Sequence, residues 1–214
     1  EWMTCVGRLA FPIFAFMIAE GCYYTSNVKK YMLRLFLFAI ISEIPFNLIM
    51  GSSVFYPFHQ NVLWTFLLGV LSIQIIEKAK KKQKKWISFF VVCLVLLMDF
   101  LLGTITMVDY NAAGILTVLL FYFFRKKTWI SFAAQLVGLY YLNVVMLGNL
   151  YYPVMILGHH FEIAQQSFAL LALIPIWLYH GEQGYHSKWF KYFCYAFYPV
   201  HLLILVVIWQ WRIR

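Results

Sequence analysis

The sequence has few charged residues: Asp, Glu, Lys and Arg make up 12% of the 214 residues, whereas 64% are hydrophobic. A soluble domain normally carries about 25% charged residues. A water-soluble chain of this length has no core large enough to bury so much apolar surface. A bilayer removes the difficulty, because lipid covers the outward faces of the helices. The composition therefore excludes a soluble domain and predicts a single integral membrane domain over residues 1–214.

The sequence also lacks the short motifs of several enzyme and binding classes. It contains no Walker phosphate loop, no G-x-G-x-x-G, no H-E-x-x-H and no G-x-S-x-G. The cysteines, Cys5, Cys22, Cys93 and Cys194, include no C-x-x-C pair. We interpret them as buried apolar thiols and not as a disulfide framework. Function must therefore be sought in other residues.

Long apolar runs fill most of the chain. A membrane-spanning helix needs about 20 mostly apolar residues, and runs that are apolar on all sides suit lipid-exposed helices. We therefore predict an all-α, polytopic transmembrane helical bundle of about eight spans, with the third and fifth short. Because the first run starts almost at once, and not from a methionine, we expect one further N-terminal span before it. The spans are expected at residues 5–24, 31–50, 61–76, 86–107, 111–124, 129–147, 162–179 and 189–211.

The net charge of +9 is distributed in alternate loops. Lysine or arginine follows the first, third, fifth and seventh predicted spans, whereas loops 51–60, 108–110 and 148–161 contain neither. By the positive-inside rule, the basic loops are cytoplasmic. We therefore expect a multi-pass protein of the inner (cytoplasmic) membrane, with the lipid bilayer as its partner and no nucleic acid.

Ionisable residues lie inside the first two predicted spans: Arg8 and Glu20 in the first, and Arg34 and Glu43 in the second. Such residues are costly in a bilayer and are candidates for function. Counting outward from the short basic turn between the spans places Glu20 level with Arg34, and Arg8 level with Glu43. We hypothesise two interhelical ion pairs, which either hold the helices in register or take part in chemistry.

Further candidates lie in the last span and at span ends. His201 falls in mid-span, where an imidazole acts as a general base or simply bonds a neighbouring helix. Asp109 and Tyr110 precede the fifth span, and Asn61 opens the third. Asp109 is a candidate for substrate contact or for helix capping, and Asn61 for substrate contact or an interfacial role.

One outer loop holds the densest cluster of potential metal ligands, His159, His160 and Glu162. A metal site needs three or four converging ligands, whereas the side chains of adjacent histidines point apart. We therefore interpret the cluster as a solvated loop and predict no metal.

Several blocks of residues together form a more specific pattern. The first blocks are Gly7-Arg8-Leu9-Ala10-Phe11-Pro12-Ile13-Phe14 and Glu20-Gly21, and the last is Phe197-Tyr198-Pro199-Val200-His201-Leu202. Between them lie Arg34-Leu35, Ser42-Glu43-Ile44-Pro45-Phe46, Asn61-Val62 and Asp109-Tyr110. On these blocks the chain resembles the TraX family, which is named for the membrane acetylase that N-acetylates F-type pilin.

The resemblance implies a membrane-embedded acyltransferase. It would take acetyl-CoA as co-substrate from the cytoplasmic side and acetylate an acceptor amine, such as a pilin-like N-terminus. Acetyl transfer requires a base for the amine proton and groups that stabilise the thioester oxygen. The catalytic candidates are His201 as base with Glu20 or Glu43 to orient it, and the binding candidates are Arg8, Arg34, Asn61, Asp109 and Tyr110.

The chain departs from the family pattern in two places. Family members usually begin with another hydrophobic helix that ends in an Asp-His pair, so a catalytic histidine is also expected there. Tyr179-His180-Gly181 stands where the family has Tyr-Asn-Gly. Two other functions remain open, a small-solute transporter and a non-catalytic membrane factor in conjugation or pilus assembly. The lack of visible inverted repeats argues against transport.

Overall fold

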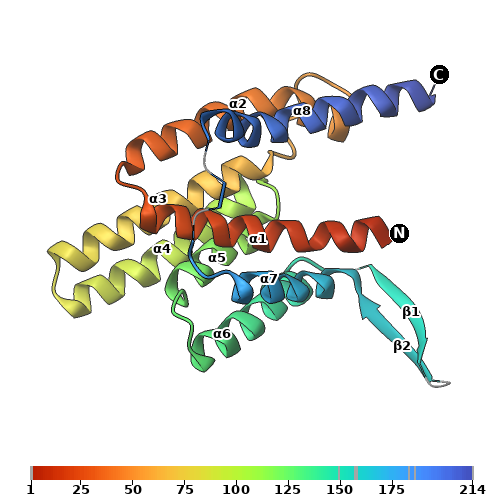
Figure 1. Ribbon diagram of the computed structural model, residues 1–214. Coiled ribbons are helices and arrows are strands. Elements are labelled where there is room, and N and C mark those ends of the chain that lie inside the picture. The colour runs from red at the N-terminus through yellow and green to blue at the C-terminus, as the bar shows by residue number, and fades with distance from the viewer. Residues whose placement is uncertain (1, 149, 157–158, 183, 186, 214) are drawn as a thin grey trace.

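The computed structural model describes residues 2–148, 150–156, 159–182, 184–185 and 187–213, and most of them are helical, as predicted (Figure 1). The α-helices of the described chain are α1 (Trp2–Tyr24), α2 (Val28–Gly51), α3 (Val62–Lys82), α4 (Lys85–Ile105), α5 (Asn111–Phe123), α6 (Trp129–Leu139), α7 (Leu173–Leu178) and α8 (Lys188–Ile213). A π-helical turn, Tyr140–Met146, continues α6.

Six helical segments of the described residues are long and apolar enough to cross a membrane. They correspond to α1, α2, α3, α4, α6 with its π-helical turn, and α8. Two more apolar segments, Asn111–Phe123 and Gln165–Leu178, are shorter. The chain is therefore a multi-pass membrane protein built as a helical bundle.

The third span is longer than we predicted. We expected it to end at Ile76, but α3 continues to Lys82 and so takes in part of the lysine-rich segment. Lysine is a good helix former, and lysines in a last turn interact favourably with the carbonyl end of the helix. Hydropathy alone therefore locates the end of the apolar part and not the end of the helix.

The segment predicted as the seventh span begins as a β-hairpin. Strand β1 (Tyr151–Ile156) pairs antiparallel with β2 (His159–Ala164), with Tyr151 opposite Ala164 and Met155 opposite His160. A 3-10 helix, Gln165–Ala172, then leads into α7. The predicted helix from Glu162 is therefore wrong at its start, where the chain is still in β2. The hairpin strands, Tyr151–Ile156 and His159–Ala164, are rich in aromatic and β-branched residues, which favour strands.

The bundle has two distinct ends in Figure 1. We call one the hairpin end; it carries the start of α1, the end of α8 and the β-hairpin. We call the other the lysine end; it carries the turn from α3 to α4 and the start of α2. Helices α1 to α4 and α8 lie lengthwise between the two ends (Figure 1), so a residue's position along one of these helices gives its level in the bundle.

The core lies among α1, α3 and α5. Ala15, Val70 and Val118, one from each helix, have no exposed surface. Helix α5 also approaches α4 very closely, because a Cβ on Gly103 would lie 2.5 Å from the Cα of Ala112. The principal neighbour of α8 is α2, outside this core. Helix α8 is therefore attached to the bundle mainly through α2 and not through the core.

Candidate functional site

A cavity of about 420 Å³ lies between α1, α2, α3 and α8, and Asp109 and Tyr110, just before α5, also line it. Four of the predicted site residues line it: Arg34, Asp109, Tyr110 and His201. The rest of the lining is mostly apolar and aromatic. Small-molecule sites of about 300–1,000 Å³ have this character, an apolar wall with a few placed polar groups.

His201 enters the cavity from α8. Its Nδ1 lies 3.0 Å from the carbonyl oxygen of Phe197, one turn earlier, and its ring stacks on the Phe197 ring with centroids 5.2 Å apart. A carbonyl oxygen only accepts hydrogen bonds, so this contact places the proton of the neutral imidazole on Nδ1. Nε2 is then the basic nitrogen of the ring. The group that orients His201 is thus the Phe197 carbonyl, where we had expected Glu20 or Glu43.

Arg34 enters the cavity from α2 and has no carboxylate partner among the described residues. Its guanidinium carbon lies 5.8 Å from the ring centroid of Tyr195 and 6.0 Å from that of Tyr31. Its Nε is buried without a hydrogen-bond partner in the described part of the chain. Aromatic faces stabilise a cation but leave the N–H donors of the guanidinium available to an anion.

The two predicted ion pairs between the first helices do not form. Glu20 Oε1 lies 2.5 Å from Nε of Arg125, which follows α5. Arg8 Nη2 donates to Gln165 Oε1 at 3.2 Å. Counting from the turn gives the level of a residue but not the direction in which its side chain points. Helix α1 packs extensively on α5 and on the 3-10 helix, so these neighbours supply the partners.

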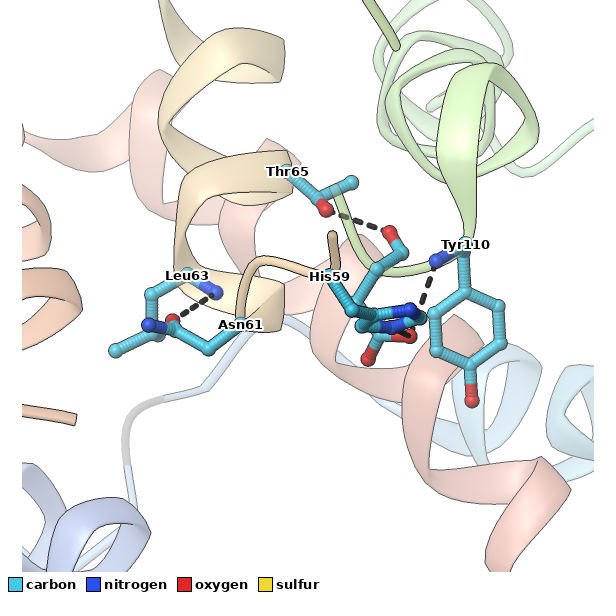
Figure 2. Close-up of polar contacts among 6 residues, drawn as sticks. His59, Asn61, Leu63, Thr65 and Tyr110 are labelled. Carbon is cyan, nitrogen blue, oxygen red and sulfur yellow. Dashed lines mark hydrogen bonds and ion pairs between the residues drawn. The ribbon is translucent and has the colours of Figure 1, made fainter. Parts of the chain in front are cut away.

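Glu43 and Asn61 lie behind the cavity wall and bond each other. Glu43 Oε2 accepts from the indole N–H of Trp64 at 2.9 Å and from the side-chain amide of Asn61. That amide also donates to the Ala39 carbonyl at 2.9 Å, and its oxygen accepts the backbone N–H of Leu63 at 3.1 Å (Figure 2). Asn61 therefore caps α3, and its amide group is fully used within the protein.

Asp109 lines the cavity and is held from several directions. Its Oδ1 lies 3.3 Å from Nε2 of His59 and accepts the backbone N–H of Tyr110 at 3.1 Å. The Thr65 hydroxyl donates to its backbone carbonyl at 2.6 Å. Figure 2 shows His59, Thr65 and Tyr110 gathered around this point. The hydrogen bond to the Asp109 carboxylate raises the pKa of His59 above its ordinary value.

The backbone around Asp109 adopts an unfavourable conformation. Met107, Tyr110 and Asn111 all have positive φ, at 51°, 62° and 47°. This left-handed region costs a residue with a Cβ about 1–2 kcal/mol. The turn brings the Tyr110 ring onto Phe11 of α1, with centroids 3.8 Å apart and planes 12° apart. Strain of this kind gathers at functional sites.

His59 is the site residue that sequence reasoning missed. It lies 50 positions before Asp109, and no local pattern links the two. One signal was present, because His59 stands three residues before the start of α3 and Asp109 two residues before the start of α5. Polar residues that precede neighbouring helices at the same end of a bundle are close in space.

His159, His160 and Glu162 belong to the β-hairpin. In the described part of the chain, no group of three or more His, Cys, Asp or Glu side chains converges. His160 and Glu162 lie on β2, and the side chain of His159 is outside the described residues. The cysteines of the described chain are free thiols.

Comparisons with known proteins give one family and one relative. The family model described as TraX protein matches residues 1–209. The probable fimbrial assembly protein FimC, serogroup H1, of Dichelobacter nodosus is 26% identical over 221 residues, which cover 96% of this chain and 82% of that protein. No solved structure gives a significant match.

Proposed function

Because the chain belongs to the TraX family, we propose that it is a membrane-embedded acetyltransferase that moves an acetyl group from acetyl-CoA to an acceptor amine. One observation carries the proposal: within the described part of the chain, a single cavity combines an imidazole whose basic nitrogen makes no hydrogen bond, a guanidinium without a carboxylate partner, and a carboxylate. These are the groups that acyl transfer to an amine requires.

The polar groups of the cavity are ordered along the bundle. Arg34 and the Tyr195 ring that it contacts belong to the part of the cavity nearer the lysine end, since α2 and α8 both start from that side. Asp109 lines the same cavity and faces Tyr198, one turn after Tyr195 on α8. His201 follows Tyr195 by six residues, about 9 Å along α8. The groups therefore follow one another along the bundle in the order Arg34, Asp109 and His201.

The charge pattern gives this order a direction. By the positive-inside rule, we expect the lysine end to face the cytoplasm. Acetyl-CoA is a polyanion, and the basic loops at that end attract its phosphates. In our proposal the thioester enters the cavity from the lysine end, and the acceptor amine approaches from the hairpin end.

The chemical step is an addition and elimination at the thioester carbon. The amine nitrogen attacks that carbon, the N–C bond forms and the C–S bond breaks. Nε2 of His201 takes a proton from the nitrogen and returns it to the departing CoA thiolate. Arg34 binds the donor or stabilises the charge that develops on the thioester oxygen. Glu43 supports the wall through Trp64 and Asn61 and does not contact the reacting atoms in this scheme.

The name of the relative suggests the acceptor. A fimbrial assembly protein acts on or with the subunits of a surface fibre, so we propose a pilin-like N-terminal amine as the acceptor. The same name favours a second candidate, a non-catalytic membrane factor in fimbrial or conjugative pilus assembly. In that role the cavity would bind a subunit without chemistry.

One experiment separates the two candidates. Purified protein in lipid nanodiscs is incubated with labelled acetyl-CoA and a peptide with a free N-terminal amine, and CoA release and peptide labelling are measured together. The control peptide has a blocked N-terminus. Stoichiometric release and labelling with the free amine alone support the acetyltransferase. Peptide binding without release of CoA would support the assembly factor and reject the enzyme.

A further inference from the structure

The carboxylate of Asp109 is bonded on one side. Oδ1 accepts from His59 and from the Tyr110 backbone, whereas no residue in the described ranges donates to Oδ2. The side chain lines the cavity and is 28% exposed. A carboxylate fixed through one oxygen has its other oxygen available to a donor that enters the cavity.

Aromatic rings line the cavity beside this carboxylate. The Tyr110 ring stacks on Phe11 with centroids 3.8 Å apart, and Phe11 stacks on Phe66 at 5.8 Å. All three residues line the cavity. A carboxylate in an apolar wall suits an organic ammonium group, because the carboxylate attracts the charge and the wall contacts the carbon atoms that carry it.

We propose that Asp109 binds the ammonium form of the acceptor and that His59 is the positioning residue that sets the pH range of this binding. The identification of the cation as the acceptor rests on the proposed function, in which the bound ammonium first releases one proton to water so that its neutral nitrogen attacks the thioester. The existence of a cation site does not, because it is argued from the Asp109 carboxylate and the rings around it.

The backbone already holds this loop without the His59–Asp109 contact. Gln60 N–H donates to the Met107 carbonyl at 3.0 Å, and Asp109 N–H donates to the Gln60 carbonyl at 2.9 Å. The Thr65 hydroxyl adds a further bond. These hydrogen bonds already hold the two loops together. The His59–Asp109 contact therefore matters mainly for the charge that faces the cavity.

The charge at this point depends on the protonation of His59. The ionisable groups that face His59 are Asp109, from the loop before α5, and Glu43, from α2; Phe46 of α2 stacks on the imidazole with centroids 5.5 Å apart. On the other elements packed around Asp109, Arg8 of α1 faces Tyr110, and Tyr198 of α8 faces Asp109 itself. None of these residues is a second histidine.

The sign of the pH effect follows from the pair. Protonated His59 compensates the Asp109 charge and weakens the attraction for an ammonium group. Neutral His59 still donates its Nε2 proton to Oδ1 but adds no charge, so the carboxylate attracts the ammonium fully. Because the pKa of His59 lies above its ordinary value, tight binding is expected to appear as the pH rises through that raised pKa. A roughly tenfold change in Kd is typical of coupling between two sites.

A fixed-charge ligand tests the proposal. An acceptor peptide with a trimethylated N-terminus stays cationic at every pH and cannot be acetylated, so its binding reports the site alone. Its Kd for the protein in nanodiscs is measured from pH 5.5 to 8.5 without acetyl-CoA. We expect Kd to fall about tenfold with rising pH in the wild type. In His59→Gln it should stay low throughout, because glutamine donates to Oδ1 without ever carrying a charge.

Two control variants complete the test. Asp109→Asn should bind the peptide weakly at every pH, and His180→Gln, in an exposed loop, should keep the wild-type profile. If His59→Gln retains the wild-type pH dependence, or Asp109→Asn binds as tightly as the wild type, the inference is overturned. If Asp109→Asn does not fold, the profile of His59→Gln still decides.

The outcome is independent of catalysis. The expected binding profile without any acetyl transfer in the nanodisc assay would keep the cation site and reject the acetyltransferase. Acetyl transfer with peptide binding that does not respond to pH or to His59→Gln would keep the enzyme and reject this site.

Discussion

Buried and half-buried charges behave differently in two regions of the molecule. Near the lysine end, Glu20 is paired with Arg125 at 2.5 Å, and Glu77 contacts Lys80 at 3.9 Å and bonds the Tyr122 hydroxyl. In the cavity, among the described residues, Arg34 has no carboxylate partner, Asp109 Oδ2 accepts no hydrogen bond and His201 Nε2 makes none.

The difference separates charged side chains that bond neighbouring helices together from charged side chains that are available to bind a ligand. When one member of an ion pair is removed, the other charge is left without compensation, so the removal lowers the stability of the protein. A charge left open toward a cavity already bears that cost and is retained for what it binds. Changes in the first region should therefore alter stability, and changes in the second should alter binding and catalysis.

The substitution that tests this comparison most directly is His201→Ala. We expect acetyl transfer to fall at least about 100-fold, since a general base contributes about 10²–10⁴-fold. Membrane insertion and Tm should stay as in the wild type, because His201 lies at the cavity and outside the core. The measurement is CoA release in nanodiscs, with His180→Ala as the matched histidine control. Wild-type rates in His201→Ala would remove this residue from the chemistry.

Arg34→Ala should raise the KM for acetyl-CoA by about 10–100-fold, the loss expected for one charge-assisted contact of about 1.5–3 kcal/mol. Arg34→Lys keeps the charge but not the planar group that lies against Tyr195, so it should recover only part of the loss. Steady-state kinetics against acetyl-CoA concentration measure both. An unchanged KM together with a lower Tm would class Arg34 with the lysine-end charges.

Glu20→Gln should act on stability. The side chains of Glu20 and Arg125 are 12% and 26% exposed, so the loss should be about 1–2 kcal/mol, less than for a fully buried pair. Tm in detergent should fall by about 2–4 °C per kcal/mol for a chain of this size. Acetyl transfer per folded molecule is the second readout. A loss of transfer with Tm intact would return Glu20 to the catalytic candidates.

The smallest effect concerns the pH dependence of stability at His59. Because the pKa of His59 is raised, its pair with Asp109 stabilises the fold fully at pH values below the ordinary histidine pKa of about 6.5. This stabilisation is lost as the pH rises through the raised pKa. Because the His59 side chain is 39% exposed, solvent screening keeps the contribution under about 1 kcal/mol. The Tm difference between wild type and His59→Gln should be larger at pH 6 than at pH 8.5, and equal differences would show that the contact contributes nothing.

The helices could be predicted because a bilayer allows few alternatives. Apolar runs located α1, α2 and α4 to within a few residues, since each must satisfy its own backbone in lipid. The β-hairpin was missed because it needs no apolar run and lies at the end of the bundle. Hydropathy describes segments in lipid and says little about what stands beyond them.

The candidate site could be predicted as residues but not as contacts. Arg34, Asp109, Tyr110 and His201 were singled out separately and share one cavity. The partner of Glu20 was wrong because the rotation of α1 about its axis depends on α5, which no count along the chain provides. His59 acquired its role through a contact between two loops, and no periodicity encodes such a contact.

The strained turn before α5 has a consequence for how this sequence would change under selection. Met107→Gly should raise stability by about 1 kcal/mol, because glycine adopts positive φ without penalty. Tyr110→Gly would relieve the same strain but would also remove the ring that lies on Phe11 at the cavity. Loss of a packed aromatic ring costs about 3–5 kcal/mol, more than the roughly 1–2 kcal/mol of strain that glycine would relieve. Screening for thermal resistance would therefore favour glycine at 107 but keep tyrosine at 110, where packing holds the strained backbone in place.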